Sequence, residues 1–560
     1  MKRFLTFMIS AALVLSLTAC GSGKQTPAQE TAAPTKAETT APAEEATTAP
    51  AEAATNSVPG ETSAEKPEGM PPEMSGETPP EMSGETPPAP PEGGGMPGGS
   101  FSDNPGEMPP APPEGGGMPG GNPPGGGPGG ETPPAPPEGG MPGGNPPGGG
   151  PGGSSTDIDY TGAVKITSGE TQSGQTYTST TADESALLIT TSDGVTITDP
   201  AVTKSGDSDG GDNSSFYGLN AAVLVKDGGT TTITGGTVTS DASGANGVFC
   251  YGGNGGRNGA AGDGTTVIIR NTKIVTTGDG SGGLMTTGGG VTTAYDLDVT
   301  TSGRSSAPIR TDRGGGTVTV EGGTYTSHGL GSPAIYSTAD VTVSGAALTS
   351  TLSEGVCIEG LNSVTLNDCD LTACNTQRNS NASFLDSVMI YQSMSGDSAA
   401  GTGRFTMTGG TLTSRSGHIF HVTNTSAVIT LQGVTIVNED LDNILLSVCT
   451  DGWSGAQNAA VLKAAAQELS GAVKVGSDSS LTLELTDGSS FTGFIDGSIV
   501  NAKGETVSTE TGAVSVILDA SATWTLTADS YVTEFTGDAS CVISNGHTLY
   551  VNGTPLSGTK

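Results

Sequence analysis

Residues 305–327, SSAPIRTDRGGGTVTVEGGTYTS, contain the unit on which the fold of this chain depends. Two runs, 309–312 and 318–325, alternate apolar and polar side chains, and the glycine run 314–316 separates them. Alternation with a period of two is typical of a strand with one buried face, and glycine turns a corner at the lowest steric cost. The stretch therefore predicts short strands joined by tight corners.

Variants of this unit, V-x-V-x-G-G-T-φ-T with φ apolar, recur between residues 195 and 436. In every copy a second apolar residue follows the central one after five positions. The central residues are Ile197, Ile233, Ile269, Ala294, Val320, Val343, Leu366, Met407 and Leu431. Their separations show a base period of 23–26 residues with longer steps of 36, 36 and 41. A fixed period interrupted by insertions predicts a solenoid.

A second short strand precedes most copies, as in APIRTD from residue 307 and PAIYSTAD from residue 333. Two or three strands per turn with Gly, Asn and Asp corners predict an all-β fold, a right-handed parallel β-helix, over residues 157–560. Its turns would stack about 4.8 Å apart. A β-sandwich or propeller is the alternative, and it would need antiparallel hairpins or a period near 40–45 residues.

The pattern loosens from about residue 440 to the C-terminus. Residues 458–469 have helix propensity, but Leu481, Leu483 and Leu485 alternate again. We therefore expect further coils here, and a C-terminal cap formed by GHTLYVNGTPL, because an open end of the solenoid would expose unpaired strand edges.

The first 20 residues form a predicted signal peptide. Lys2 and Arg3 precede an apolar run over 4–17 that is too short to span a bilayer. The sequence LTAC at 17–20 resembles a bacterial lipobox and predicts lipidation of Cys20, which would anchor the exported chain to the outer face of the membrane. An ordinary signal peptide with a chance cysteine is the alternative.

Residues 21–156 predict a disordered tether. This segment holds 32 of the 36 prolines and nearly literal repeats such as PPEMSGET and PPAPPEGG, with almost nothing to bury. The whole chain has a formal net charge of −37, which argues against nucleic acid or an anionic membrane surface as a partner. Divalent cations and neutral glycans remain compatible with this charge.

The predicted coils resemble the right-handed β-helix superfamily that holds pectate lyases, polygalacturonases and many bacterial adhesins. The lipobox, the Pro/Gly/Met tether and the Thr/Gly-rich coils are more closely similar to clostridial surface β-helix lipoproteins. The resemblance implies display at the cell surface and, for some members, binding of plant polysaccharides. It is a likeness of repeat style without a catalytic motif, so it does not by itself assign a function.

Strand parity indicates where a ligand would bind. If Ile309, Ile335, Ile358 and Ile390 point inward, then one outer face gathers aromatic, carboxylate and guanidinium groups, extended by Tyr251, Met285 and His421. The predicted ligand-binding residues are Arg310, Asp312, Tyr336, Glu359, Tyr391 and His421. Aromatic faces stack on sugar rings, and charged groups bind hydroxyls or uronates. The alternative is a solvated face whose residues merely suit a strand.

Three classes of function follow from this face: binding of an extended polysaccharide, cleavage of a uronate-containing glycan by a lyase or hydrolase, and adhesion to a protein. The catalytic candidates are Arg310, Asp312 and Glu359. Asp312 and Glu359 would lie two coils apart, with roughly 9–10 Å between their backbones, which is near the upper limit for the carboxylate pair of an inverting glycosidase. The paired-aspartate and Gly-His-Gly motifs of polygalacturonases are absent, and so is HExxH. Binding is the preferred prediction.

Two further features of the sequence concern metal and disulfides. Asp207, Asp209 and Asp212 lie close together in one insertion and suit calcium, although their spacing is not that of an EF-hand and acidic loops are commonly just solvated. Export permits disulfides among the six cysteines after Cys20, and Cys369 with Cys374 is the first pair to consider.

Overall fold

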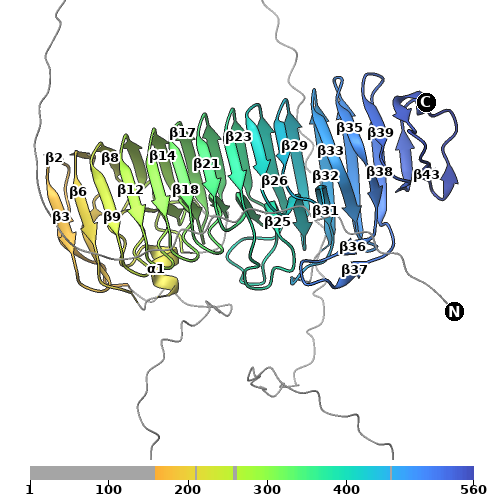
Figure 1. Ribbon diagram of the computed structural model, residues 1–560. Coiled ribbons are helices and arrows are strands. Elements are labelled where there is room, and N and C mark those ends of the chain that lie inside the picture. The colour runs from red at the N-terminus through yellow and green to blue at the C-terminus, as the bar shows by residue number, and fades with distance from the viewer. Residues whose placement is uncertain (1–157, 209–210, 256–260, 454–456) are drawn as a thin grey trace, which may run out of the picture. The chain divides into compact units, whose positions relative to one another are not determined.

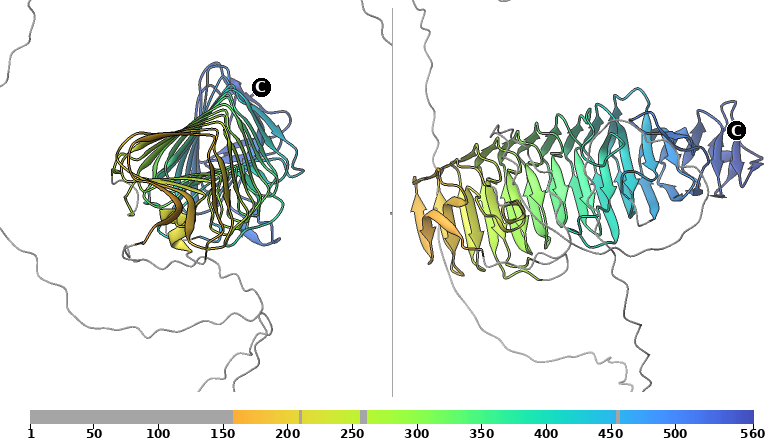
Figure 2. Two further views of the ribbon diagram at one scale, coloured as in Figure 1. Left: turned by 90° about the vertical axis from the view of Figure 1, so that its left-hand side faces the viewer. Right: turned by 90° about the horizontal axis from the view of Figure 1, so that it is seen from below.

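The computed structural model describes residues 158–208, 211–255, 261–453 and 457–560. They form a stack of coils in which almost every strand pairs in parallel with the equivalent strands of the neighbouring coils (Figure 1). Three long sheets run along the stack and, seen along its axis, enclose a common interior (Figure 2). The predicted all-β parallel β-helix is confirmed.

The sheets are named A, B and C in the order in which the chain meets them. Sheet B has 14 strands, from β2 (Glu170–Ser173) to β41 (Glu534–Thr536), and sheet C has ten, from β3 (Thr176–Ser179) to β30 (Thr435–Asn438). The 15 strands of sheet A are β1 (Thr161–Ile166), β4 (Glu184–Thr190), β7 (Val223–Lys226), β10 (Val248–Tyr251), β13 (Leu284–Thr287), β16 (Ile309–Thr311), β19 (Ile335–Ser337), β22 (Val356–Glu359), β25 (Asp386–Tyr391), β28 (His418–Thr423), β31 (Ile444–Val448), β33 (Glu468–Val475), β35 (Ser490–Asp496), β39 (Thr523–Leu526) and β42 (Val542–Ile543).

The corner between sheets B and C is two residues long in every coil that has both sheets. Between β17 (Gly316–Glu321) and β18 (Thr324–Ser327), for example, the chain turns through Gly322 with φ of 68°. The first corner residue always has positive φ, and it is Gly174, Asp199, Gly235, Asn271, Asp296, Gly322, Gly345, Asp368, Gly409 or Gly433. Only Gly, Asn and Asp adopt this backbone conformation cheaply. The constant corner accounts for the constant five-residue spacing in the sequence.

The interior is filled by ladders of inward side chains. In sheet A, Ile309 pairs with Ile335 and Ile335 with Val356, and all three are fully buried. Equivalent ladders from sheets B and C complete one hydrophobic core that extends through the stack. Each such side chain contributes about 1.5–3 kcal/mol when fully buried. The predicted parity of the sheet A strands is therefore confirmed.

The further coils expected beyond residue 440 are present, and they belong to the same stack but with two main sheets. Sheet C ends at β30, whereas sheets A and B continue to β42 and β41. The segment with helix propensity forms β32 (Asn458–Ala465) and the start of β33, because its alternate side chains are buried. The last residues form a small sheet of β40 (Ser530–Val532), β43 (Leu549–Val551) and β44 (Thr554–Pro555) at the end of the core.

All long insertions border sheet A. Residues 205–222 and 374–385 lie between sheets C and A, and residues 252–265, 392–401, 449–457 and 497–512 lie between sheets A and B. The first of them contains α1 (Asp212–Tyr217), the only α-helix among the described residues. No described helix is long and apolar enough to span a membrane.

Cys369 and Cys374, the first pair to consider, are not bonded to each other, because all six cysteines in the described part of the chain are free thiols. Cys369 packs in the core, and its thiol donates to the Val343 carbonyl at 3.4 Å. Cys374 follows the far end of β24 (Asp370–Ala373). A strand that advances about 3.3 Å per residue separates the two Cα atoms by well over the ~7 Å that a disulfide spans.

Candidate functional site

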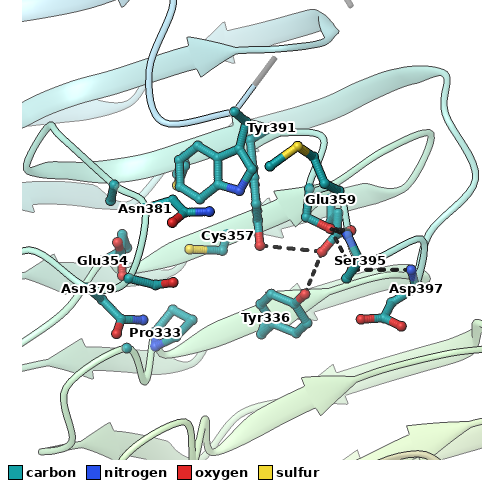
Figure 3. A pocket seen from close by; sticks show the side chains of 17 residues that line it. Pro333, Tyr336, Glu354, Cys357, Glu359, Asn379, Asn381, Tyr391, Ser395 and Asp397 are labelled. Carbon is teal, nitrogen blue, oxygen red and sulfur yellow. Dashed lines mark hydrogen bonds between the residues drawn. The ribbon is translucent and has the colours of Figure 1, made fainter. Parts of the chain in front are cut away.

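A pocket of about 410 Å³ opens on the outer face of sheet A over β19, β22 and β25 (Figure 3). The insertions 374–385 and 392–401 and the loop after β31 rise around it. Its lining residues are Gly331, Pro333, Tyr336, Glu354, Cys357, Glu359, Asn379, Ser380, Asn381, Ala382, Met389, Tyr391, Ser393, Met394, Ser395, Asp397 and Trp453. The volume lies within the range of small-molecule sites.

Strand register brings the central side chains together. Tyr336 in β19 is paired with Cys357 in β22, and Glu359 in β22 is paired with Tyr391 in β25. Neighbouring strands lie about 4.8 Å apart, and side chains two residues apart on a strand share a face. Tyr336 and Tyr391 therefore reach Glu359 from the two coils that flank it.

Glu359 forms the floor of the pocket and is 1% exposed. Its Oε2 accepts a hydrogen bond from the Tyr336 hydroxyl at 2.6 Å and a longer one from the Tyr391 hydroxyl at 3.3 Å, while Oε1 accepts from Ser393 (Figure 3). Burial raises the pKa of Glu359, and the hydroxyl donors oppose this effect by stabilising the carboxylate. The result is a buried carboxylate that three hydroxyl groups hold at the bottom of the pocket.

A second carboxylate, Asp397, lines the pocket from the insertion after β25. Its Oδ1 accepts a hydrogen bond from Arg313 at 2.6 Å, and the Arg313 guanidinium lies over the Phe216 ring at 4.0 Å. These contacts tie the insertion to the neighbouring coils. A third carboxylate, Glu354, lies before β22 and accepts a hydrogen bond from Ser353.

Aromatic rings form one wall of the pocket. The Trp453 ring packs against the Tyr391 ring with centroids 5.0 Å apart and planes inclined by 57°. Asn379 and Asn381 bring amide groups from the insertion before β25, and Asn379 also accepts a hydrogen bond from Arg304 at 2.7 Å (Figure 3). Aromatic surface beside amide, hydroxyl and carboxylate groups suits a ligand with both apolar faces and hydroxyls.

Of the six residues predicted to bind ligand, the structure gathers three in the pocket: Tyr336, Glu359 and Tyr391. Arg310 and Asp312 are not among its lining residues. The Arg310 guanidinium donates to Asp312 Oδ2 at 2.8 Å and to the Ser305 carbonyl at 2.9 Å. Burial raises the pKa of Asp312 to about 7, in spite of the positive charge of Arg310. Of the three catalytic candidates, Glu359 lines the pocket, and Arg310 and Asp312 do not.

His421 is fully buried below the insertions and does not line the pocket. Its Nδ1 hydrogen-bonds with Ser447 Oγ at 2.7 Å, and its ring packs on Phe384. Its Nε2 lies 3.6 Å from Oδ2 of Asp451, whose Oδ1 accepts the Ser383 amide at 2.7 Å. The histidine therefore braces two of the loops that shape the pocket.

The remaining sites predicted from the sequence lie elsewhere. Tyr251 and Met285 belong to an apolar cluster with Leu188, Leu224 and Phe249 on the outer face of sheet A. The predicted row of ligand-binding side chains therefore does not continue onto these strands. Asp207 accepts the Ser243 amide at 2.8 Å, Asp212 begins α1, and Asp209 lies outside the described residues, as does Cys20. No group of three or more His, Cys, Asp or Glu side chains suited to a metal occurs in the described ranges.

Sequence reasoning missed Trp453, Asp397 and the two asparagines, because loops carry no strand parity. Two features of the sequence point toward them. The 41-residue step between Leu366 and Met407 marks the coil that carries both neighbouring insertions. Trp453 is one of only two tryptophans and lies on a loop, where functional side chains concentrate.

Comparison of the chain with protein-family models, with curated proteins and with solved structures found no match.

Proposed function

We propose that this protein binds a saccharide in the pocket over β19, β22 and β25. The carrying observation is the carboxylate of Glu359, held at the pocket floor by the hydroxyls of Tyr336 and Tyr391 beside the Trp453 ring. A fixed carboxylate accepts hydrogen bonds from sugar hydroxyls, and an aromatic wall packs on the apolar face of a sugar ring. Glu359 and Tyr391 lie on strands of the stack, and this fixed placement lowers the entropic cost of binding.

We also propose a location for the protein, on the outside of the cell. The N-terminal sequence supports export, lipidation at Cys20 and attachment to the outer face of the membrane, with residues 21–156 as a tether. The ligand would then be an extracellular glycan or a cell-wall polymer, as in the surface lipoproteins that the chain resembles. Metabolic labelling with a radioactive fatty acid tests this part, since Cys20→Ala must abolish incorporation.

A glycan array followed by calorimetric titration tests binding. We expect Trp453→Ala to weaken the affinity for the best array ligand by about tenfold, the loss of one aromatic stacking contact. The matched control is Tyr531→Ala, which removes an exposed ring far along the stack from the pocket. Equal affinities of the Trp453→Ala variant and the unaltered protein would contradict the assignment of this pocket.

A glycoside hydrolase is a second candidate, favoured by two carboxylates in different surroundings. Burial raises the pKa of Glu359, which suits a proton donor, whereas Asp397 is held in an ion pair with the Arg313 guanidinium. Reducing-end and unsaturated-uronate assays decide between the classes: released product favours catalysis, and binding without product favours the first proposal. Neither product nor glycan binding would favour a protein-binding adhesin.

A further inference from the structure

The pocket is lined by charges of one sign. Glu354, Glu359 and Asp397 contribute carboxylates, and its described lining contains no Lys, Arg or His. Two guanidinium groups contact lining residues from outside: Arg313 pairs with Asp397, and Arg304 donates to the Asn379 amide oxygen. Among the residues that the structure describes, no Lys or Arg pairs with Glu359, whose hydrogen-bond donors are three hydroxyl groups.

Neighbouring groups respond to this negative field. Burial, followed by the charges of Glu354, Asp386 and Glu359, raises the pKa of the Cys357 thiol. Burial and the charge of Glu359 likewise raise the pKa of Tyr336. Burial is the larger cause in both groups and disfavours any ion, whereas the contribution of the carboxylate charges disfavours anions and favours a cation.

We propose that the preferred ligand of this pocket is a saccharide that bears a free, positively charged amino group. The inference rests on the proposed saccharide function and specifies its substrate class. An ammonium group donates up to three hydrogen bonds, and carboxylate oxygens at the pocket floor accept them. Aromatic rings beside the carboxylates add a favourable electrostatic contact for a cation.

The same geometry disfavours the uronates that the sequence suggested. Arg310 is one of the predicted ligand-binding residues, and its guanidinium is engaged with Asp312 and the Ser305 carbonyl outside the pocket. A uronate would bring its carboxylate toward Glu359 without a lining cation to separate them. Like charges brought together in a partly buried site repel each other strongly.

Calorimetric titration of the full-length protein with four soluble oligosaccharides tests this inference. The probes are oligomers of glucosamine, N-acetylglucosamine, glucose and galacturonic acid. We expect the glucosamine oligomer to bind about tenfold more tightly than its acetylated counterpart, the effect of one charge-assisted hydrogen bond. Glu359→Gln, which keeps the size of the side chain and removes its charge, must abolish the preference, whereas Glu321→Gln on an exposed part of β17 must retain it.

The outcomes separate the inference from the function on which it rests. Equal or tighter binding of the acetylated or glucose oligomer overturns the amine preference and leaves saccharide binding intact. Absence of binding by all four probes, and by every glycan of the array, overturns saccharide binding itself. If the Glu359→Gln variant does not fold, as judged by its far-UV circular dichroism, the salt dependence of the unaltered protein replaces it. The affinity for the glucosamine oligomer must then fall as salt is raised, and a constant affinity overturns the amine preference.

Discussion

Tyr336→Phe and Tyr391→Phe provide a matched test of the geometry at the pocket floor. Both substitutions delete one phenolic hydroxyl, and both hydroxyls donate to the same atom, Oε2 of Glu359. The distances differ, 2.6 Å for Tyr336 and 3.3 Å for Tyr391. We therefore expect different effects on the ionisation of Glu359 from two chemically identical changes.

The expected magnitude follows from the hydrogen-bond lengths. A well-formed hydrogen bond to a charged group contributes about 1.5–3 kcal/mol, so Tyr336→Phe moves the titration midpoint of Glu359 upward by roughly one to two pH units at 1.36 kcal/mol per unit. The Tyr391 contact exceeds the usual O–H···O length of up to about 3.0 Å, and its loss moves the midpoint by roughly half a unit or less. Each change has the same sign, because each removes a donor to the ionised form.

Carbon-13 NMR of the full-length protein labelled at the glutamate carboxyl carbon measures these midpoints, and Glu359→Gln assigns the resonance. Tyr295→Phe is the control, since its ring lies over Arg270 on sheet B and does not line the pocket. An equal or larger upward movement in the Tyr391→Phe variant than in Tyr336→Phe would refute the proposed arrangement of the two hydroxyls.

Three further outcomes are expected. The melting temperature falls as pH rises from about 4 to about 7, because burial raises the pKa of folded Asp312 to about 7, and the folded state then holds a proton that the unfolded state releases. The Asp312→Asn variant should show a weaker pH dependence of the melting temperature, and an unchanged dependence contradicts this assignment. Phe405→Ala costs about 3–5 kcal/mol in thermal or denaturant unfolding, since the ring is fully buried against Phe420, whereas a loss below about 1 kcal/mol excludes the described packing. Brief alkylation of the native protein followed by mass mapping labels Cys374 before Cys250, Cys357, Cys369, Cys449 and Cys541, because Cys374 is half-buried and the others are buried; faster labelling of any of those five opposes this assignment.

The coil architecture follows from the sequence because its causes are local. Alternation at Val318 and Val320 specifies which face is buried, and the Gly-Gly pair after Glu321 specifies a corner of two residues. Such patterns act within a few residues and repeat in every coil. The same parity argument correctly placed Tyr336, Glu359 and Tyr391 on one outer face.

The rest of the site depends on interactions that parity does not encode. Arg310 has the right parity, but its guanidinium turns to Asp312 two residues away instead of to a ligand. His421 also has the right parity, but Phe384 from an insertion covers it. Trp453 reaches the pocket from a loop two strands further along sheet A. The path of an insertion over a sheet is set by contacts distant in sequence, and a single sequence does not reveal them.

The invariant corner between sheets B and C has a consequence for tolerance to change. Each coil that has both sheets passes through the same two-residue turn, so a length difference at either edge of sheet A is absorbed before the next strand of sheet C begins. The insertion 392–401 illustrates this, because β26 (Thr402–Thr408) and β27 (Thr411–Ser414) follow it in full register with the preceding coil. The loops around the pocket can therefore be lengthened, shortened or exchanged without changing the strand register of the coils that follow. The protein thus separates the loops that shape the pocket from the coils that maintain its fold.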